Sequence, residues 1–146
     1  MPTVNGCNIP DELLYDVDNH IWFQEQGDGT IKLGMTTVAT AMAGQLVAFT
    51  PKKAGRSVDA GKSCATVESG KWVGPAKSAA AGEVVAVNTD LIANPQIANT
   101  DPYDKGWFII LKPNNWDAVK PTLTPGAAVT PKYVAKMAAD GFAGCP

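Results

Sequence analysis

Two stretches in the middle of the chain repeat one pattern of polar and apolar positions. Residues 44–49 and 82–87 both follow the order glycine, polar, aliphatic, valine, alanine, apolar. Each is followed, after a loop, by a second short apolar stretch, at residues 62–67 in the first case and 107–111 in the second. Short apolar runs bounded by turn residues are typical of buried strands. The repeat therefore predicts a β sandwich of two halves related by approximate twofold symmetry.

The segment before the first repeat predicts a hairpin and a short helix. A Gly-Asp-Gly turn at residues 27–29 is flanked by residues 20–26 and 30–34, which is a strong hairpin signal. Residues 35–43 are rich in alanine and threonine and predict a short helix that ends near Gly44.

The C-terminal third predicts a long connection and a terminal helix. Residues 90–104 contain two prolines and many Asn and Asp residues, and we expect one short helical turn there. Proline 113 is expected to end the preceding strand. Residues 131–139 predict a helix with Thr130 as N-cap and Gly141 as the stop. Its buried stripe is expected at helical spacing, on Tyr133, Val134 and Met137.

Composition favours one globular domain. The 146 residues are 45% hydrophobic and 18% charged, with a formal net charge of −2. The absence of a concentrated basic stripe argues against nucleic acid as a partner. No run approaches the roughly 18 apolar residues that cross a membrane. The N-terminus lacks the pattern of a secretory signal, so we expect a cytoplasmic protein without a membrane partner.

The three cysteines are an odd number without CxxC spacing, which argues against a disulfide framework or a zinc site. Cys64 lies in an apolar strand pattern and is expected to be a core thiol. Cys7 and Cys145 lie near the two ends, where exposed thiols are possible. The sequence leaves open whether they pair.

Catalysis by the chain itself is not indicated. His20 is the only histidine and precedes an apolar strand, where a histidine is more often structural than catalytic. No Ser/His/Asp or Cys/His set can be assembled. Asp101 and Asp104 are best explained as a turn that holds Tyr103 and Trp107 against the core, and no metal site is predicted.

The most informative residue is Lys71, between the strands predicted at 62–67 and 82–87. The intervening Glu68, Ser69, Gly70 and Trp72, followed by a Gly-Pro pair at 74–75, mark a loop region. A solvated turn lysine is the ordinary explanation for such a residue.

The passage around Lys71 resembles the lipoyl-attachment site of the glycine cleavage H protein and its relatives, which typically has the sequence Glu-Ser-Val-Lys-Ala. Other motifs extend the resemblance: His-Ile-Trp at 20–22, Gly-Met-Thr at 34–36 and Asp-Pro-Tyr-Asp-Lys-Gly-Trp at 101–107. The similarity covers roughly residues 18–115. We expect an N-terminal extension at 1–17, a lipoyl-carrier domain at 18–115, and a C-terminal loop and helix at 116–146 packed on that domain.

The resemblance implies a mainly β, flattened barrel-sandwich of the lipoyl/biotinyl type, with an N-terminal hairpin, a short helix and a C-terminal helix. It implies covalent attachment of lipoate to Lys71 at a hairpin tip. It also implies a non-catalytic carrier subunit, recognised by a lipoate-attaching ligase through the flanking residues Glu68, Ser69, Gly70 and Trp72. Ordinary turn chemistry is an equally good explanation for Ser69.

Departures from the family pattern cluster at the lysine. Gly70 and Trp72 stand where the family has valine and alanine, the Gly-Pro pair at 74–75 replaces Ser-Asp, and Ala79 replaces proline. The Gly-Lys-Trp site looks more like the lipoate-binding proteins of the heterodisulfide-reductase-like system of sulfur-oxidising prokaryotes. That resemblance implies a carrier of sulfur intermediates, with the heterodisulfide-reductase-like complex and dihydrolipoamide dehydrogenase as partners. Trp72 is expected to be an exposed docking anchor, the alternative being a lid over the core.

Other functions stay open. The chain can be a glycine cleavage H protein carrying an aminomethyl group, or an unmodified docking module. A biotin carrier fits less well, because that class flanks its lysine with methionines rather than with Gly70 and Trp72. A thiol enzyme using Cys7 or Cys145 ranks last, since neither has a visible base.

Overall fold

The computed structural model describes residues 3–145 and shows a mainly β fold with two large sheets. The first sheet has the strand order β12 (Thr124–Pro125), β3 (Leu14–Asp16), β4 (Ile21–Glu25), β5 (Ile31–Met35), β11 (Ile109–Pro113), β10 (Gly82–Val87) and β7 (Ser57–Val58). The second has the order β6 (Leu46–Pro51), β8 (Lys62–Ser69) and β9 (Val73–Ser78). A small ladder pairs β1 (Thr3–Val4) with β2 (Cys7–Asn8).

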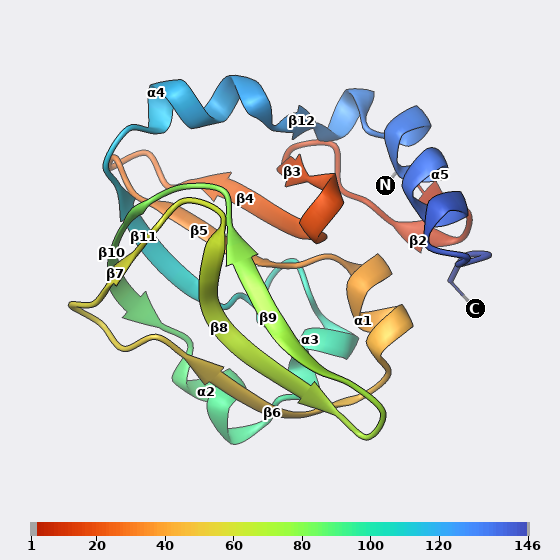
Figure 1. Cartoon of the computed structure of the whole chain (residues 1–146), viewed down its shortest axis with the longest axis horizontal. Coiled ribbons are helices and arrows are strands. Elements are labelled where there is room, and N and C mark those ends of the chain that lie inside the picture. The colour runs from red at the N-terminus through yellow and green to blue at the C-terminus, as the bar shows by residue number, and fades with distance from the viewer. Residues whose placement is uncertain (1–2, 146) are drawn as a thin grey trace.

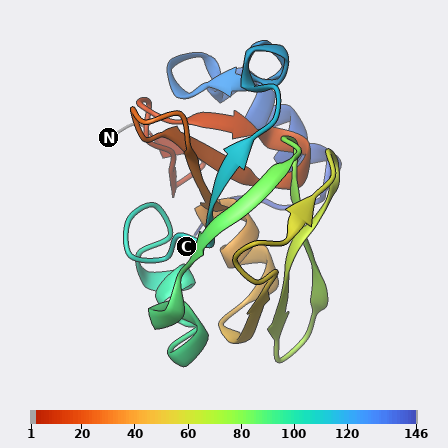
Figure 2. The same ribbon diagram turned by 90° about the vertical axis from the view of Figure 1, so that its left-hand side faces the viewer.

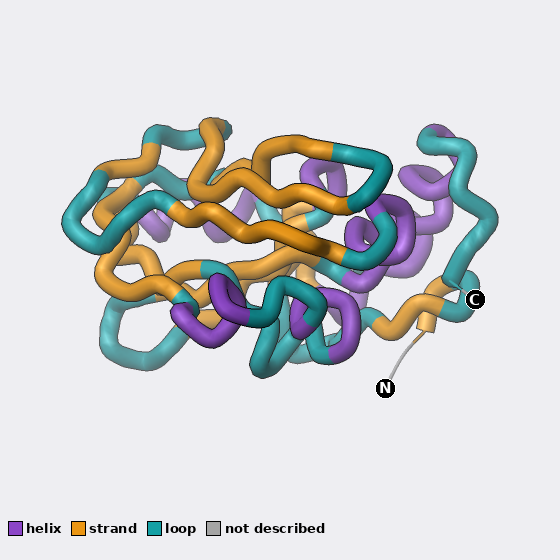
Figure 3. Tube along the Cα trace, turned by 90° about the horizontal axis from the view of Figure 1, so that it is seen from below, coloured by secondary structure: helices purple, strands orange, loops and turns teal. Residues whose placement is uncertain are grey.

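Short helices connect and flank the strands. They are α1 (Thr37–Ala43), α2 (Thr89–Ala93), α3 (Ile97–Thr100), α4 (Trp116–Val119) and α5 (Thr130–Ala139), with 3₁₀ turns η1 (Val17–Asn19), η2 (Lys120–Thr122) and η3 (Gly126–Ala128). In Figure 1, α4 and α5 run along one border of the molecule, above the three-stranded sheet. Figure 3 shows the strands stacked in layers.

The main core lies between the two sheets, as predicted for a flattened β sandwich. It takes buried apolar side chains from both sheets, for example Leu33 and Leu111 from the larger and Val67 and Ala76 from the smaller. The rings of Phe49 and Phe108 meet across the core with centroids 4.7 Å apart. The sandwich prediction is confirmed.

The two halves predicted from the sequence repeat share a detailed feature. Strand β6 pairs with β8 and strand β10 pairs with β11, both antiparallel. In each pair the register shifts at the second aliphatic position of the repeat, around Val47 in β6 and Val85 in β10. A β-bulge leaves the extra residue unpaired and bends its strand. Both valines are exposed, so the sequence repeat at residues 44–49 and 82–87 corresponds to a bulged strand that occurs twice.

The expected hairpin and short helix are confirmed. Strands β4 and β5 pair around the Gly-Asp-Gly turn, and α1 begins after Thr36, whose hydroxyl accepts the N–H of Ala39. Gly44 ends the helix with a φ of +84°. Trp22 of β4 is fully buried, and its indole N–H donates to the carbonyl of Pro102 at 3.0 Å.

Several boundaries differ from the sequence expectation. The Gly-Pro pair at 74–75 lies inside β9, not in a loop, because β9 is an edge strand where a missing N–H can face away from the ladder. Strand β11 ends at Pro113, as expected, and this residue lies beyond the last pair of β11 with β5, so its missing N–H removes no bond to that strand. The connection after β10 holds two helical turns, α2 and α3, instead of one.

The terminal helix is confirmed with two corrections. Thr130 is the first residue of α5 and is not its N-cap, since Val129 precedes the helix without a capping side chain. Tyr133 and Met137 are buried as expected, but Val134 is 43% exposed. Residues 133 and 137 share a face because they are four apart, whereas residue 134 is turned about 100° from 133.

A second core joins the two ends of the chain. It includes Val4 and Ile9 from the N-terminal segment, Tyr133 and Met137 from α5, and Val38 from α1. Within it, Cys7 and Cys145 form a disulfide across 138 residues, which settles the pairing that the sequence left open. In Figure 1, β2 and α5 lie at the same side of the molecule.

The cysteine environments divide as follows. Cys7 is fully buried, so the exposure that the sequence allowed does not occur, because the apolar side chains of both ends close over it. Cys64 is a free core thiol, as predicted, and burial raises its pKa to about 12.

Residues Met1, Pro2 and Pro146 lie outside the described residues, and the division of the chain at 17/18 and 115/116 stays a prediction. Among the described helices, none combines the length and apolar character that a membrane crossing requires.

Candidate functional site at the tip of the β8–β9 hairpin

Lys71 lies at the apex of the hairpin formed by β8 and β9. The last ladder pair joins Glu68 and Val73, and the N–H of Ser69 donates to the carbonyl of Trp72 at 2.8 Å. Gly70 and Lys71 are thus the two central residues of a tight turn. Lys71 is exposed, as the sequence predicted for a lysine at a hairpin tip. In Figure 1 this tip lies beside the connection from α1 to β6.

The hairpin is anchored at its root. Alternate side chains of β8 and β9 enter the main core, among them Cys64, Val67 and Ala76. Successive residues of a strand point to opposite faces, so the intervening side chains, such as Glu68 and Lys77, face outward. Figure 2 shows the hairpin on one side of the body and helices α2 and α3 on the other. The tip therefore stands on a packed base.

Ser69 holds the turn. It is buried, and its hydroxyl oxygen accepts the backbone N–H of Lys71 at 3.3 Å. The same hydroxyl lies 3.5 Å from the carbonyl of Trp72. These contacts support the turn-chemistry explanation for Ser69. Recognition of Glu68, Ser69 or Gly70 by a ligase stays a prediction.

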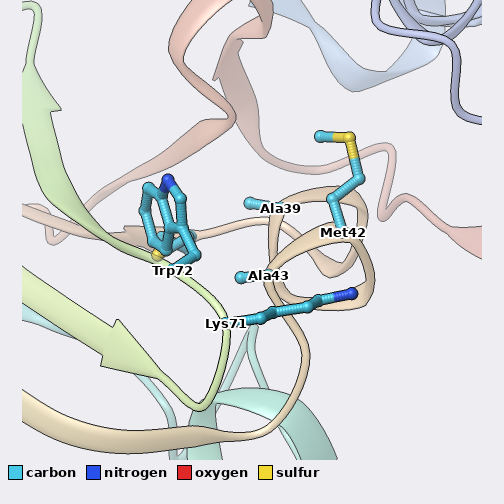
Figure 4. A pocket seen from close by; sticks show the side chains of 6 residues that line it. Ala39, Met42, Ala43, Lys71 and Trp72 are labelled. Carbon is cyan, nitrogen blue, oxygen red and sulfur yellow. The ribbon is translucent and has the colours of Figure 1, made fainter.

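A hollow of about 480 Å³ opens on one side of Lys71, and we name it the Trp72 groove. It is lined by Met35, Ala39, Met42, Ala43, Lys71 and Trp72. Ala39 and Ala43 are four residues apart on α1, so their small side chains share one face and leave the floor open. Figure 4 shows Trp72 and Met42 as facing walls, with the Lys71 side chain running beneath Ala43. The walls are apolar apart from the lysine amine.

A second hollow of about 490 Å³ lies on the other side of the lysine, and we name it the Gly44 cleft. It is lined by Ala43, Gly44, Gln45, Val47, Gly70 and Lys71. The Lys71 stem separates the two hollows. It rests against Gly44, where an added Cβ would lie 3.3 Å from the lysine Cε.

Trp72 is intermediate between the two alternatives that the sequence allowed. It is 38% exposed, and its ring lies on the backbone of Gly74, where any Cβ would collide with it. It is neither a lid over the core nor a freely projecting anchor. It forms one wall of the groove beside Lys71, and its role in docking stays a prediction.

His20 belongs to the packing of α5. Its ring nitrogens lie 3.3 Å from the hydroxyl of Tyr133 and 3.2 Å from a carboxylate oxygen of Asp140. Burial lowers the pKa of His20, while the hydrogen bond to Asp140 opposes that shift. It lines neither hollow, which supports the structural explanation.

The Asp-Pro-Tyr turn is structural as expected. The backbone N–H of Lys105 donates to Asp101, and the Tyr103 hydroxyl donates to the carbonyl of Asn8 at 2.7 Å. Trp107 is only partly buried, so its expected core position is only partly correct, and the Lys32 amine lies 5.5 Å from its ring. Within residues 3–145, no cluster of three or more His, Cys, Asp or Glu side chains suits a metal ion.

Sequence reasoning missed the α1 side of the site. Met35, Ala39, Met42 and Gly44 approach Lys71 only through the tertiary fold. The glycine at 44 was visible as a helix stop, but nothing local links it to a lysine 27 residues later.

The family model described as "Glycine cleavage H-protein" matches residues 13–135, which include the hairpin and both large sheets. The chain belongs to the glycine cleavage H-protein family. "Glycine cleavage system H protein 5" of Aquifex aeolicus is 50% identical over 127 residues, covering 84% of this chain and 85% of the relative. "Probable glycine cleavage system H protein 2" of Sulfurisphaera tokodaii is 42% identical over 132 residues, covering 89% of each.

A solved structure has the same architecture. The crystal structure of a glycine cleavage system H protein from Mycobacterium marinum superimposes with a TM-score of 0.73 at 30% identity, covering 92% of this chain and all of that chain. H proteins carry lipoate covalently attached to a lysine. The closer similarity of the Gly-Lys-Trp site to lipoate-binding proteins of sulfur oxidation stays a prediction.

Proposed function

We propose that lipoate is attached to Nζ of Lys71 as an amide and that the chain is a non-catalytic lipoyl carrier. One observation carries this proposal: the lysine that matches the family's attachment motif is exposed at the apex of a tight hairpin. A group carrier needs an accessible mount and a stable base, since the cofactor supplies the chemistry. The apex gives a ligase access to the amine, and the buried roots of β8 and β9 fix the base.

The cargo that the relatives' names favour is an aminomethyl group. In this role Lys71 would hold the lipoyl arm, and the sulfur atoms of the arm would supply the attachment point for the group between the enzymes of glycine cleavage. Dihydrolipoamide dehydrogenase would then restore the oxidised form of the arm. The partners of the carrier are then these enzymes and the lipoate-attaching ligase.

A second cargo is supported by the immediate surroundings of the lysine. Gly70 and Trp72 replace the family's valine and alanine, and Trp72 and Met42 form apolar walls beside the arm. An uncharged arm that carries sulfur suits such apolar walls better than an arm that carries an aminomethyl group, because the ammonium of that group loses hydration on burial. The proposed alternative partner is a heterodisulfide-reductase-like complex that receives sulfur intermediates. If no lipoate is found on the protein, we propose instead that it is an unmodified docking module. A cytoplasmic location stays a prediction.

Intact-mass measurement of the protein from its native host tests the attachment. We expect a single added lipoyl group, located on Lys71 by peptide fragmentation. Lys71→Arg keeps the positive charge but removes the acylatable amine, so it should abolish modification while leaving the melting curve unchanged. Lys77→Arg, an exposed lysine on β9, is the matched control and should be modified as in the wild type.

Two outcomes would contradict the assignment. Lipoyl mass retained by Lys71→Arg would place the attachment elsewhere, and a loss of folding would make Lys71 a structural residue. The cargo is tested separately, by incubating the lipoylated carrier with glycine and glycine decarboxylase. An aminomethyl adduct on the arm supports glycine cleavage, and its absence with an active decarboxylase supports the sulfur alternative.

A further inference from the structure

The connection between α1 and β6 supports the side chain of Lys71. Gly44 begins this connection with a φ of +84°, a backbone conformation that side chains disfavour. The lysine stem lies close to this backbone, because an added Cβ would lie 3.3 Å from Cε, and the end of the lysine side chain would have to shift by a few tenths of an ångström. The Gly44 backbone is therefore part of the surface against which the stem of Lys71 lies.

Asn99 of α3 holds this connection from the other side. Its Oδ1 accepts the N–H of Leu46 at 2.9 Å. Its Nδ2 donates to the carbonyl of Gly44 at 2.9 Å and to the carbonyl of Thr40 at 3.4 Å. A side-chain amide can accept and donate at once, so one residue fixes both the end of α1 and the start of β6.

We propose that Asn99 is a positioning residue for Lys71, acting through Gly44. By fixing the connection, it keeps the lysine stem in one ordered position between the Trp72 groove and the Gly44 cleft. When an acylating enzyme binds the amine, the Lys71 side chain then loses less conformational entropy, because this long flexible side chain is already ordered. This inference rests on the proposed attachment of lipoate to Lys71.

The chain contains a matched control for Asn99. Asn88 is buried, whereas Asn99 is half-buried, and it makes the same three kinds of bond: its Nδ2 donates to the carbonyls of Lys105 and Trp107, and its Oδ1 accepts the N–H of Leu91. None of these partners lines either hollow beside Lys71. An Asn→Asp change at either position replaces two donors by a carboxylate oxygen that faces carbonyl groups.

The test compares Asn99→Asp with Asn88→Asp as substrates of a purified lipoate–protein ligase supplied with lipoate and ATP. Both variants should melt at lower temperature, and assays are run well below both transitions. We expect kcat/KM for lipoylation of Lys71 to fall about five- to tenfold in Asn99→Asp, the scale set by ordering one long side chain. In Asn88→Asp it should stay within about twofold of the wild type.

An NMR signature separates positioning from general loosening of the fold. The wild type and Asn88→Asp should show a nuclear Overhauser contact between the α protons of Gly44 and the ε protons of Lys71. Asn99→Asp should lose it. Reaction of the Lys71 amine with a small acylating ester should be unchanged in all three proteins, since the amine stays exposed.

If Asn99→Asp does not fold, Gly44→Ala tests the same contact with Asn99 intact. Gly55→Ala is its control, because Gly55 also has a positive φ, +91°, but no atom within 4 Å of an added Cβ. Only Gly44→Ala should slow lipoylation. Equal rates in each pair, or an equal fall in small-ester reactivity, would overturn the positioning role. A wild type that gains no lipoate on Lys71 would overturn the proposed function instead.

Discussion

At the scale of single residues, the site depends on which side chains are absent as much as on those present. Gly74 leaves room for the Trp72 ring, and Gly44 leaves room for the stem of Lys71. The small side chains of Ala39 and Ala43 leave the floor of the Trp72 groove open. The hydroxyl of Ser69 then fixes the turn from which the lysine projects.

Trp72→Ala tests the importance of the groove wall for partner binding. The ring is partly exposed next to Lys71, and buried aromatic anchors often dominate interface energies. We expect binding of the lipoylated carrier to its partner enzyme to weaken by about 1–3 kcal/mol. Because the ring also covers Gly74, we expect a loss of folding stability of about 1 kcal/mol.

Titration calorimetry with paired melting curves measures both effects. Trp116→Ala is the control, since Trp116 lies on α4 and its indole N–H donates to Glu25. Unchanged affinity of Trp72→Ala for the partner, combined with a melting point several degrees lower, would make Trp72 a packing residue only.

At the scale of elements, α5 is docked through a polar contact as well as through apolar packing. Its Tyr133 hydroxyl contacts Thr36 at 3.0 Å and His20 at 3.3 Å, and Asp140 reaches the other ring nitrogen of His20. The helix thereby contacts the start of α1, the helix that carries the floor of the Trp72 groove. His20 has a φ of +57°, a conformation that asparagine tolerates well.

This contact predicts a pH dependence of stability. Burial lowers the pKa of His20 in the folded state, so the unfolded chain binds its proton first as the pH falls. Stability from the neutral ring is therefore present above the unfolded pKa of about 6.5 and is lost as the pH falls towards the lower folded pKa. We expect the melting temperature to drop from pH 7.5 to pH 5.5, and less so in His20→Asn. Equal slopes in the two proteins would rule out His20 as the source.

At the scale of the whole molecule, the two ends of the chain are joined. The disulfide between Cys7 and Cys145 spans 138 residues and lies within the second core. A covalent link across so long a segment restricts the unfolded chain strongly.

Cys7→Ser combined with Cys145→Ser should cost about 2–4 kcal/mol of unfolding free energy, measured by denaturant titration. Wild-type protein under reducing conditions should move to the variant's midpoint, whereas reductant should leave the variant unchanged. Cys64→Ala serves as the control for thiol loss, and its midpoint should still respond to reductant. A wild type insensitive to reductant would contradict a stabilising disulfide.

Local pattern predicted much of the fold. The repeat at 44–49 and 82–87 predicted two related strand pairs, and both carry a bulge at the same repeat position. The Gly-Asp-Gly turn predicted the β4–β5 hairpin. These features depend on residues close in the chain, whose turn chemistry and alternation are visible locally. Boundaries such as that of β9 were missed because an edge strand tolerates proline, and edge position is decided by the rest of the sheet.

The sequence by itself determined that Lys71 stands in a turn that follows the strand at 62–67, because the glycines around it are local signals. It did not show β9, the strand on the other side of the turn, because residues 74 and 75 are glycine and proline. The tertiary structure alone decided what surrounds the lysine. Met42 of α1 and Gly44, which follows α1, lie beside it, and Asn99 of α3 holds Gly44 from more than 50 residues away in the chain. It also decided the pairing of Cys7 with Cys145. Such contacts join residues far apart in the chain, and no local periodicity records which distant surfaces will meet when the sandwich closes.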